Sequence, residues 1–270
     1  MKTLTKICKL YLFDMDGTLY LGNRLFPFTK PLLAAIRNAG GKYLFMTNNS
    51  SKSVADYIKK LASLGIDATA DDFITSSQAT AYYLKQHHPG KTLYVCGTAS
   101  LIAELESQGF SVTTDLEKVE CVVMGFDTEL TFRKLEDVCK LLLANPHMPY
   151  IATNPDLVCP TEFGAVPDCG SVCIGIQNAT GRTPLVIGKP SPLMPELAMG
   201  QWGYKKEETA VIGDRIYTDI KSGLNAGITT ILVLSGETTR QILEESEDKP
   251  HYVLEDAGQL LAALQEQANG

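Results

Sequence analysis

Strand-length runs of apolar residues alternate with helical patterns along almost the whole chain of 270 residues. The runs KYLFMT at 42–47, CVVMGF at 121–126, TAVIGD at 209–214 and TTILVL at 229–234 are largely apolar rather than alternating. Such runs are typical of parallel strands that are buried on both faces of a sheet. Between them, segments such as 51–65 carry apolar residues at helical spacing and end in glycine. The alternation predicts an α/β fold with a doubly wound parallel sheet.

The composition is that of an ordinary globular protein, with 44% hydrophobic and 20% charged residues. The net charge of −7, without a dense lysine or arginine block, argues against a nucleic-acid partner or a membrane surface. The apolar run near the N-terminus is short and breaks into acidic residues, so we expect neither a signal peptide nor a membrane span, and a cytoplasmic location. The seven cysteines lack paired spacing, which predicts reduced thiols and no cysteine metal site.

Four polar side chains stand directly after apolar runs. These are Asp14, Thr47, Lys189 and Asp214. Ligands of open parallel sheets bind outside the carboxyl ends of the strands, so we expect the four side chains to converge. Two carboxylates suit Mg²⁺, which takes few protein ligands together with phosphate oxygens, while a lysine and a hydroxyl suit the phosphate itself. The set predicts a site for a phosphoryl group and a magnesium ion.

Two other motifs fit this sequence less well. DMDGTLY, which begins at Asp14, has its glycine in fourth place, whereas a calcium-binding EF-hand loop needs it in sixth. The segment that ends in Lys189 lacks the glycine spacing of a P-loop, and Pro190 stands where a serine or threonine is required. Taken alone, each of the four polar residues would more often be a capping or surface residue. The prediction of a phosphoryl and magnesium site therefore depends on all four occurring together.

The motifs resemble those of the haloacid dehalogenase (HAD) superfamily of phosphotransferases. DMDGTL, MTNNS, GKPSP and GDRIYTD are similar to its four motifs and occur in the same order. TNN together with GKPSP is similar to the branch that contains the 4-nitrophenylphosphatases and the NagD-like sugar and nucleotide phosphatases. The resemblance implies a Rossmann-like core and a hydrolase of phosphomonoesters (EC 3.1.3.-).

The second and third motifs are widely separated, with 142 positions from Thr47 to Lys189. This is far more than one strand and helix require. The resemblance implies that the intervening chain is a second α/β domain, a large C2-type cap of subfamily IIA. We therefore expect a core built from residues 1–80 and 183–270, and a cap at 81–182.

The resemblance also implies roles for the acidic residues. Asp14 is expected to be the nucleophile, which forms an aspartyl-phosphate. Asp16 is expected to protonate the leaving alcohol and then to activate water, while its backbone carbonyl binds Mg²⁺. Asp14 and Asp214 complete the expected metal ligands, and Asp219 is expected to orient metal-bound water or Lys189 from behind them.

The same resemblance implies four phosphate-binding residues. The hydroxyl of Thr47 and the backbone amide of Asn48 are expected to hold phosphoryl oxygens, and Asn49 is expected to help through its amide. Lys189 is expected to neutralise charge on both the phosphate and Asp14.

The candidate specificity loop is the stretch 153–171, which is rich in glycine and proline. Asn154, Asp156 and Glu162 are our candidates for contacts with the leaving group. Vitamin B6 phosphatases of this branch have a histidine where this chain has Cys159, so pyridoxal phosphate is less favoured. Sugar phosphates or nucleoside monophosphates are the expected substrates, with 4-nitrophenyl phosphate as a substrate in vitro.

Two alternatives to a hydrolase stay open. One is a non-catalytic protein that binds phosphorylated metabolites, which is disfavoured because Asp14, Asp16, Lys189 and Asp214 are all present. The other is a phosphotransferase that passes the phosphoryl group to an acceptor other than water. The branch also often forms homodimers, which the sequence does not test.

Overall fold

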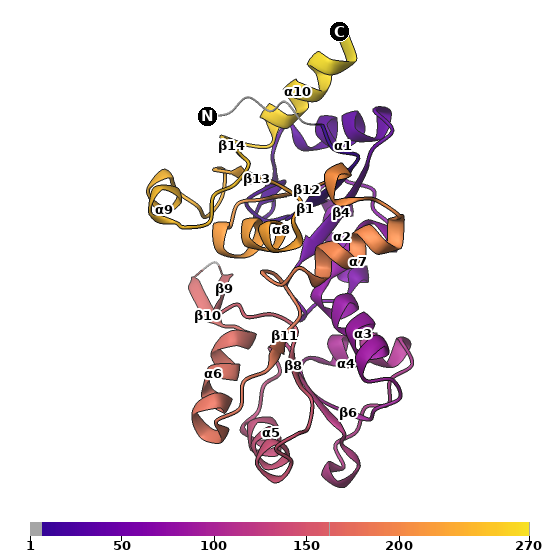
Figure 1. Cartoon of the computed structure of the whole chain (residues 1–270), viewed down its shortest axis with the longest axis vertical. Coiled ribbons are helices and arrows are strands. Elements are labelled where there is room, and N and C mark those ends of the chain that lie inside the picture. Colours follow the sequence, from indigo (N-terminus) through magenta and orange to yellow (C-terminus); the bar gives the residue numbers. More distant parts are fainter. Residues whose placement is uncertain (1–6, 162, 270) are drawn as a thin grey trace. The chain divides into compact units, whose positions relative to one another are not determined.

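The computed structural model of the chain describes residues 7–161 and 163–269. They divide into two compact units, each described here by itself (Figure 1). The first unit contains the chain up to Thr47, the segment Tyr57–Ile74 and the chain from Lys189 onward. The second unit contains Asn48–Asp56 and Thr75–Gly188.

A six-stranded sheet forms the centre of the first unit. In spatial order its strands are β14 (Tyr252–Leu254), β13 (Thr229–Val233), β12 (Thr209–Gly213), β1 (Leu10–Phe13), β4 (Lys42–Thr47) and β5 (Phe73–Thr75). The pairs from β14 to β4 are all parallel. The chain builds outward from β1 in both directions, which confirms the predicted doubly wound topology and puts the switch point of the sheet beside β1.

Helices accompany the strands of the first unit. They are α1 (Thr29–Asn38), α2 (Val54–Ser63), α7 (Leu193–Trp202), α8 (Lys221–Ala226), α9 (Arg240–Glu245) and α10 (Gly258–Asn269). Helix α1 packs against α10, and α7 packs against α8 (Figure 1). Two pieces bear on the site: a π-helical turn at Ile216–Ile220 after β12, and a short hairpin of β2 (Tyr20–Leu21) and β3 (Arg24–Leu25) after β1.

The second unit has its own parallel sheet. Its strands, in order, are β11 (Leu185–Val186), β8 (Tyr150–Ala152), β7 (Cys121–Met124) and β6 (Leu93–Cys96). Its helices are α3 (Ser76–His87), α4 (Ala99–Ser107), α5 (Phe132–Ala144) and α6 (Cys169–Thr180), and β9 (Val158–Thr161) pairs with β10 (Gly164–Pro167) in a hairpin. No helix within the described ranges is long and apolar enough to cross a membrane.

The division into units differs in detail from the expected domain edges at 81 and 182. The second unit begins at Thr75, because β5 runs into α3 without a linker and Thr75 caps that helix. The Thr75 hydroxyl accepts a hydrogen bond from the Gln78 amide at 3.1 Å, while the Gln78 side chain accepts one from the Thr75 amide. The second unit also takes Asn48–Asp56, a segment that the sequence placed in the core.

One predicted strand belongs to a different sheet. The sequence predicted that the run LVIG before Lys189 forms a strand of the core, and this is wrong. Only Leu185–Val186 form a strand, β11, and it pairs with β8 in the second unit. An apolar run does not specify which of two parallel sheets it joins, and Lys189 enters the first unit after this strand.

The centre of the first sheet is a dense apolar layer. Leu12 of β1 lies in register with Leu44 of β4 and Val211 of β12, and all three side chains are fully buried. Removing a buried leucine side chain loses its transfer free energy and leaves a cavity. The strand order of the sheet reverses beside β1. The packing of this layer therefore holds in place the strand that leads into the site described below.

We predict that Leu12→Ala lowers the free energy of unfolding by about 2–5 kcal/mol. Leu21→Ala removes the same atoms from a residue that is 49% exposed and should change it by less than about 0.5 kcal/mol. Urea denaturation followed by circular dichroism measures both. Equal losses in the two variants would contradict the burial of Leu12 in a packed layer.

Candidate active site

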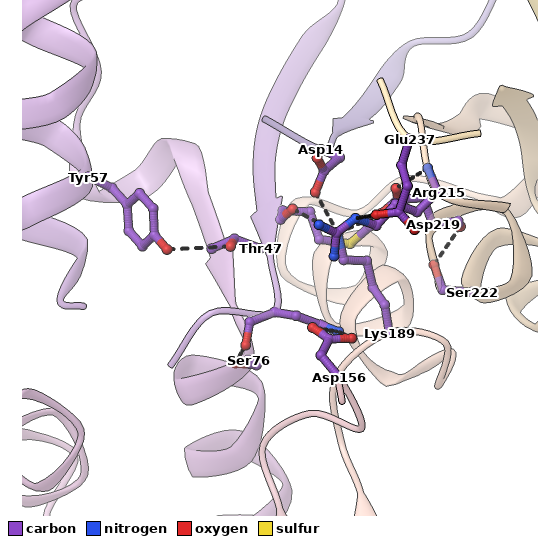
Figure 2. A network of polar contacts seen from close by, with 12 residues as sticks. Asp14, Thr47, Tyr57, Ser76, Asp156, Lys189, Arg215, Asp219, Ser222 and Glu237 are labelled. Carbon is purple, nitrogen blue, oxygen red and sulfur yellow. Dashed lines mark hydrogen bonds and ion pairs between the residues drawn. The ribbon is translucent and has the colours of Figure 1, made fainter. Parts of the chain in front are cut away.

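A buried lysine lies at the carboxyl end of the first sheet. The Lys189 ammonium donates hydrogen bonds to Asp14 Oδ1 at 2.7 Å, to Asp219 Oδ1 at 2.6 Å and to the Met46 carbonyl at 3.3 Å (Figure 2). Lys189 is only 3% exposed, so all three donors of its ammonium are directed at protein acceptors. The lysine therefore joins residues that follow or end three different strands.

The backbone fixes each partner of this lysine. Asp14 follows β1, and its amide donates to the Ile212 carbonyl of β12 at 2.8 Å. Asp219 lies in the π-helical turn after β12, and its Oδ2 accepts a hydrogen bond from the Arg215 amide at 3.1 Å. A Cβ at Gly213 would lie 2.4 Å from the Asp219 side chain, so this strand end requires a glycine for Asp219 to fit.

Asp214 lies between two other glycines. A Cβ at Gly17 would lie 2.4 Å from Asp214 Oδ2, and one at Gly236 would lie 2.0 Å from it. Gly17 has φ +84°, a conformation that favours glycine in its own right. Asp214 Oδ2 accepts a hydrogen bond from the Glu237 amide at 2.7 Å. Asp214 Oδ1 is buried and has no hydrogen-bond partner among the described residues.

The three carboxylates form a candidate cation site. One oxygen from each of Asp14, Asp214 and Asp219 lies within 4.8 Å of the other two. With Lys189 as the cation hydrogen-bonded within the group, three carboxylates leave an excess of negative charge. An unpaired buried carboxylate oxygen, here Asp214 Oδ1, is costly unless a cation or water binds it. Hard oxygen donors with few protein ligands fit Mg²⁺.

Burial and mutual repulsion shift the titration of the group. Burial raises the pKa of Asp14 to about 6, although Lys189 opposes the shift. Burial and then repulsion by Asp14 raise the pKa of Asp214 to about 8. Burial alone would lower the pKa of Lys189, but Asp14 and Asp219 outweigh it and raise that pKa. The lysine therefore stays charged, and a bound cation would favour the ionised carboxylates.

The carboxylate of Asp16 is not a member of this group. Its side chain is 57% exposed, and Oδ1 accepts a hydrogen bond from the Gly22 amide at 3.3 Å. Oδ2 lies 3.9 Å from the ammonium of Lys60, which also lies 4.3 Å from the centre of the Tyr20 ring. The two aspartates of DMDG are thus separated in environment: Asp14 faces the lysine, and Asp16 faces outward toward the hairpin.

Thr47 ends β4 next to Met46, whose carbonyl accepts from Lys189. Thr47 is 8% exposed, and its hydroxyl lies 3.5 Å from the hydroxyl of Tyr57, at the limit of a hydrogen bond (Figure 2). The predicted strand-end position of Thr47 is confirmed.

The remaining predicted residues lie in the second unit. The side-chain amide of Asn48 donates to the Asp156 carboxylate. Asn49 Oδ1 accepts hydrogen bonds from the backbone amide and the hydroxyl of Ser51. Asn154 is fully buried and donates to the backbone carbonyl of Asn48. Glu162 lies outside the described residues.

The sequence reasoning missed the segment Ser235–Thr238, which follows β13. The Glu237 and Thr238 amides donate to Asp214, and the Ser235 hydroxyl donates to the Gly17 carbonyl at 2.7 Å. The Arg215 side chain forms an ion pair with Glu237 at 2.9 Å. The rule that selected Asp14 and Asp214, a polar residue directly after an apolar run, also applies to SGET after TTILVL and would have found it.

Comparison with known proteins identifies the family of the chain. A sequence model of the haloacid dehalogenase-like hydrolases matches residues 11–111, and a second HAD-hydrolase-like model matches residues 186–260. An acid sugar phosphatase of Staphylococcus epidermidis is 36% identical over 255 residues, which cover 94% of this chain and 97% of that protein.

Solved structures with the same fold cover most of the chain. The 4-nitrophenylphosphatase from Thermotoga maritima matches with a TM-score of 0.90 and 40% identity, covering 96% of this chain and 98% of its own. NagD from E. coli matches with a TM-score of 0.85 and 31% identity, covering 94% and 98%.

A glycerol phosphate phosphatase from Mycobacterium tuberculosis, solved in complex with magnesium, has a TM-score of 0.85 and 30% identity. The match covers 91% of this chain and 74% of that one. These matches agree with the family that the four motifs indicated. The chain therefore belongs to the haloacid dehalogenase-like hydrolases and is a phosphatase of their NagD-like branch.

Proposed function

We propose that this phosphatase is a Mg²⁺-dependent phosphomonoester hydrolase that acts on small phosphorylated metabolites through an aspartyl-phosphate on Asp14. The observation that carries the proposal is the cluster of three carboxylates, two of which are hydrogen-bonded to one buried lysine. Among the three, the Asp14 side chain is 17% exposed, whereas that of Asp219 is fully buried and Asp214 is 2% exposed. Asp14 is thus the carboxylate that a substrate can reach.

In the proposed reaction an oxygen of Asp14 attacks phosphorus, and the bond from phosphorus to the ester oxygen breaks. Lys189 holds the attacking carboxylate at 2.7 Å and offsets the charge of the phosphoryl group. Asp16 gives its proton to the departing alcohol. In the second step Asp16 takes a proton from water, the water oxygen bonds to phosphorus, and Asp14 is released with phosphate.

Asp16 suits this role because its carboxylate can move. It is exposed, and its contacts are one backbone amide at 3.3 Å and a lysine at 3.9 Å. Exposed ion pairs of this kind contribute about 0–1 kcal/mol, so the side chain can reorient without breaking a buried network. Asp14, in contrast, is held in place by Lys189, which suits a nucleophile that must stay aligned.

The metal ligands of the proposal are the carboxylates of Asp14 and Asp214 and the backbone carbonyl of Asp16. When bound, Mg²⁺ supplies positive charge to the phosphoryl oxygens as negative charge shifts in the transition state. Both carboxylate oxygens of Asp219 accept hydrogen bonds, from Lys189 and from the Arg215 amide. This supports its proposed role as the residue that orients Lys189.

For substrate binding we propose the Thr47 hydroxyl, the backbone amide of Asn48 and the amide of Asn49 as phosphoryl ligands, together with Lys189, as the family resemblance implies. We also propose that the second unit is the cap. A sugar phosphate is the first substrate to test, because a relative at 36% identity is an acid sugar phosphatase. Among solved structures, the 4-nitrophenylphosphatase match makes 4-nitrophenyl phosphate the natural in vitro substrate.

The central test is phosphate release from 4-nitrophenyl phosphate and a panel of sugar phosphates and nucleoside monophosphates. We predict activity with Mg²⁺, loss of activity with a chelator, and recovery when Mg²⁺ is restored. Asp14→Asn should reduce kcat by at least about a thousandfold, because it removes the nucleophile. No release from any substrate, or an Asp14→Asn variant that keeps its rate, would refute the proposal. Phosphate transfer to an added acceptor in place of release would instead favour a phosphotransferase.

The two roles of Asp16 can be separated by leaving group. Asp16→Asn should slow the first step with an alkyl phosphate by about 10²- to 10⁴-fold, the usual contribution of a general acid. With 4-nitrophenyl phosphate the first step should suffer much less, since nitrophenolate leaves without a proton. Single-turnover quench measurements isolate that step. If both substrates lost the same factor, Asp16 would not be the acid.

The raised pKa of Asp214, about 8 against an ordinary 3.8, predicts how pH affects the metal-free protein. The folded state retains a proton that the unfolded state has lost, so this stabilising contribution declines as pH rises from about 4 through 8. Mg²⁺ binding should raise Tm most at the upper end of this window. In Asp214→Asn, both the decline and the Mg²⁺ effect should shrink. Thermal unfolding at pH 5, 6.5 and 8, with and without Mg²⁺, measures this, and parallel curves for wild type and variant would contradict it.

A further inference from the structure

The residue after β4, Asn48, is held by hydrogen bonds at its backbone and at its side chain. Its carbonyl accepts hydrogen bonds from the Ser76 hydroxyl at 2.6 Å and the Asn154 amide at 3.0 Å. Its side-chain amide donates to both oxygens of Asp156, at 3.2 and 3.3 Å (Figure 2, where Ser76 and Asp156 are labelled). All four residues belong to the second unit.

A single buried side chain organises these contacts. Asn154 is fully buried; its Nδ2 donates to the Asn48 carbonyl, and its Oδ1 accepts from the Asp156 amide at 3.0 Å. The second bond turns the chain so that the Asp156 carboxylate faces Asn48. Both ends of its amide are bonded to backbone and its surface is fully buried, so Asn154 is poorly placed to contact a leaving group.

The surroundings prevent these residues from relaxing. A Cβ at Gly188 would lie 2.6 Å from Asn48 Oδ1 and 2.5 Å from the Thr153 carbonyl. The Gly170 amide donates to the Asp156 carbonyl at 2.9 Å, and a Cβ at Gly170 would lie 2.1 Å from the Pro155 carbonyl. The loop that carries Asp156 is therefore packed tightly at both glycines.

The Asp156 carboxylate also fixes the orientation of the Asn48 side-chain amide. An ionised carboxylate only accepts hydrogen bonds, so the NH₂ end of the amide must face it and the oxygen must point away. That oxygen is the atom that packs at the Gly188 backbone. Hydrogen bonds to a charged acceptor are stronger than neutral ones, so this pair selects one conformation of Asn48.

We propose that Asn154 and Asp156 are positioning residues, which hold Asn48 in its phosphate-binding conformation and do not contact the leaving group. This rests on the proposed function, in which the backbone amide of Asn48 binds the phosphoryl group. Every substrate of the enzyme carries the same phosphoryl group, and only the leaving group differs. Loss of the Asp156 carboxylate should therefore lower the affinity for all phosphorylated ligands by one common factor.

The test is Asp156→Asn, which keeps the shape of the side chain and removes its charge. We expect KM to rise about tenfold for 4-nitrophenyl phosphate and for glucose 6-phosphate alike, with a smaller change in kcat, and the inhibition constant of inorganic phosphate to rise by the same factor. Glu136→Gln is the matched control, because Glu136 is half-exposed and pairs with Lys140 on the surface of α5. It should change none of the three constants.

A double variant distinguishes positioning through Asn48 from a direct effect. In an Asn48→Ala background, Asp156→Asn should cause no further loss in phosphate affinity, because the side chain through which Asp156 holds the Asn48 backbone is gone. Besides Asn154, Ser76 is the side chain that donates to the Asn48 carbonyl. Ser76→Ala should therefore also lower the affinity for all three ligands by one factor, and it replaces Asp156→Asn if that variant folds poorly.

Two outcomes would overturn the inference. One is a loss with glucose 6-phosphate that is absent with 4-nitrophenyl phosphate and inorganic phosphate, which would make Asp156 a leaving-group contact. The other is a fully additive double variant. A wild-type protein without phosphatase activity would instead refute the proposed function, so the two failures are distinguishable.

Discussion

The pairing of the Lys189 ammonium with carboxylates is the interaction on which the rest of the site depends. A buried ammonium is costly unless charged and polar acceptors replace its water, and here Asp14, Asp219 and the Met46 carbonyl do so. Because these acceptors come from β1, β4 and the turn after β12, the lysine can be satisfied only when those strands are neighbours. The order β4–β1–β12 provides this. The same contacts that stabilise the lysine thus bring together the ends of these strands and the carboxylates beside them.

The site carries more negative charge than the lysine alone can balance, and the surrounding backbone is built to tolerate it. Three glycines, Gly17, Gly213 and Gly236, leave room for carboxylates that any side chain would displace. Two backbone amides, of Arg215 and Glu237, donate to them. What stays unbalanced, the buried Asp214 Oδ1, is the feature that a cation would complete. The unpartnered Asp214 oxygen is therefore the feature of this carboxylate cluster that best fits the proposed cation.

The sequence predicted the fold class and most of the first unit's site because both depend on local patterns. Continuous apolar runs marked the strands, and Asp14, Thr47 and Asp214 were found because each stands at a strand end. Lys189 does meet Asp14, as expected, but the reason given for it was wrong, since its preceding strand belongs to the other sheet. The pairing of Asn48 with Asp156 could not be predicted, because the two residues are 108 positions apart and only the folded second unit brings them together.

The boundary between the units passes through the second motif itself. Thr47 belongs to the first unit and Asn48 to the second, although one peptide bond joins them. Ser50 also bonds to the rest of the second unit. Its hydroxyl lies 2.9 Å from the Thr153 hydroxyl and accepts a hydrogen bond from the Phe126 amide at 2.9 Å. A segment bonded at Asn48 and Ser50 to the loop that begins at Thr153 cannot change independently of it. Under the proposed function, mutations of this loop would therefore also disturb the phosphate ligand at Asn48, unless they leave Asn154 and Asp156 in place.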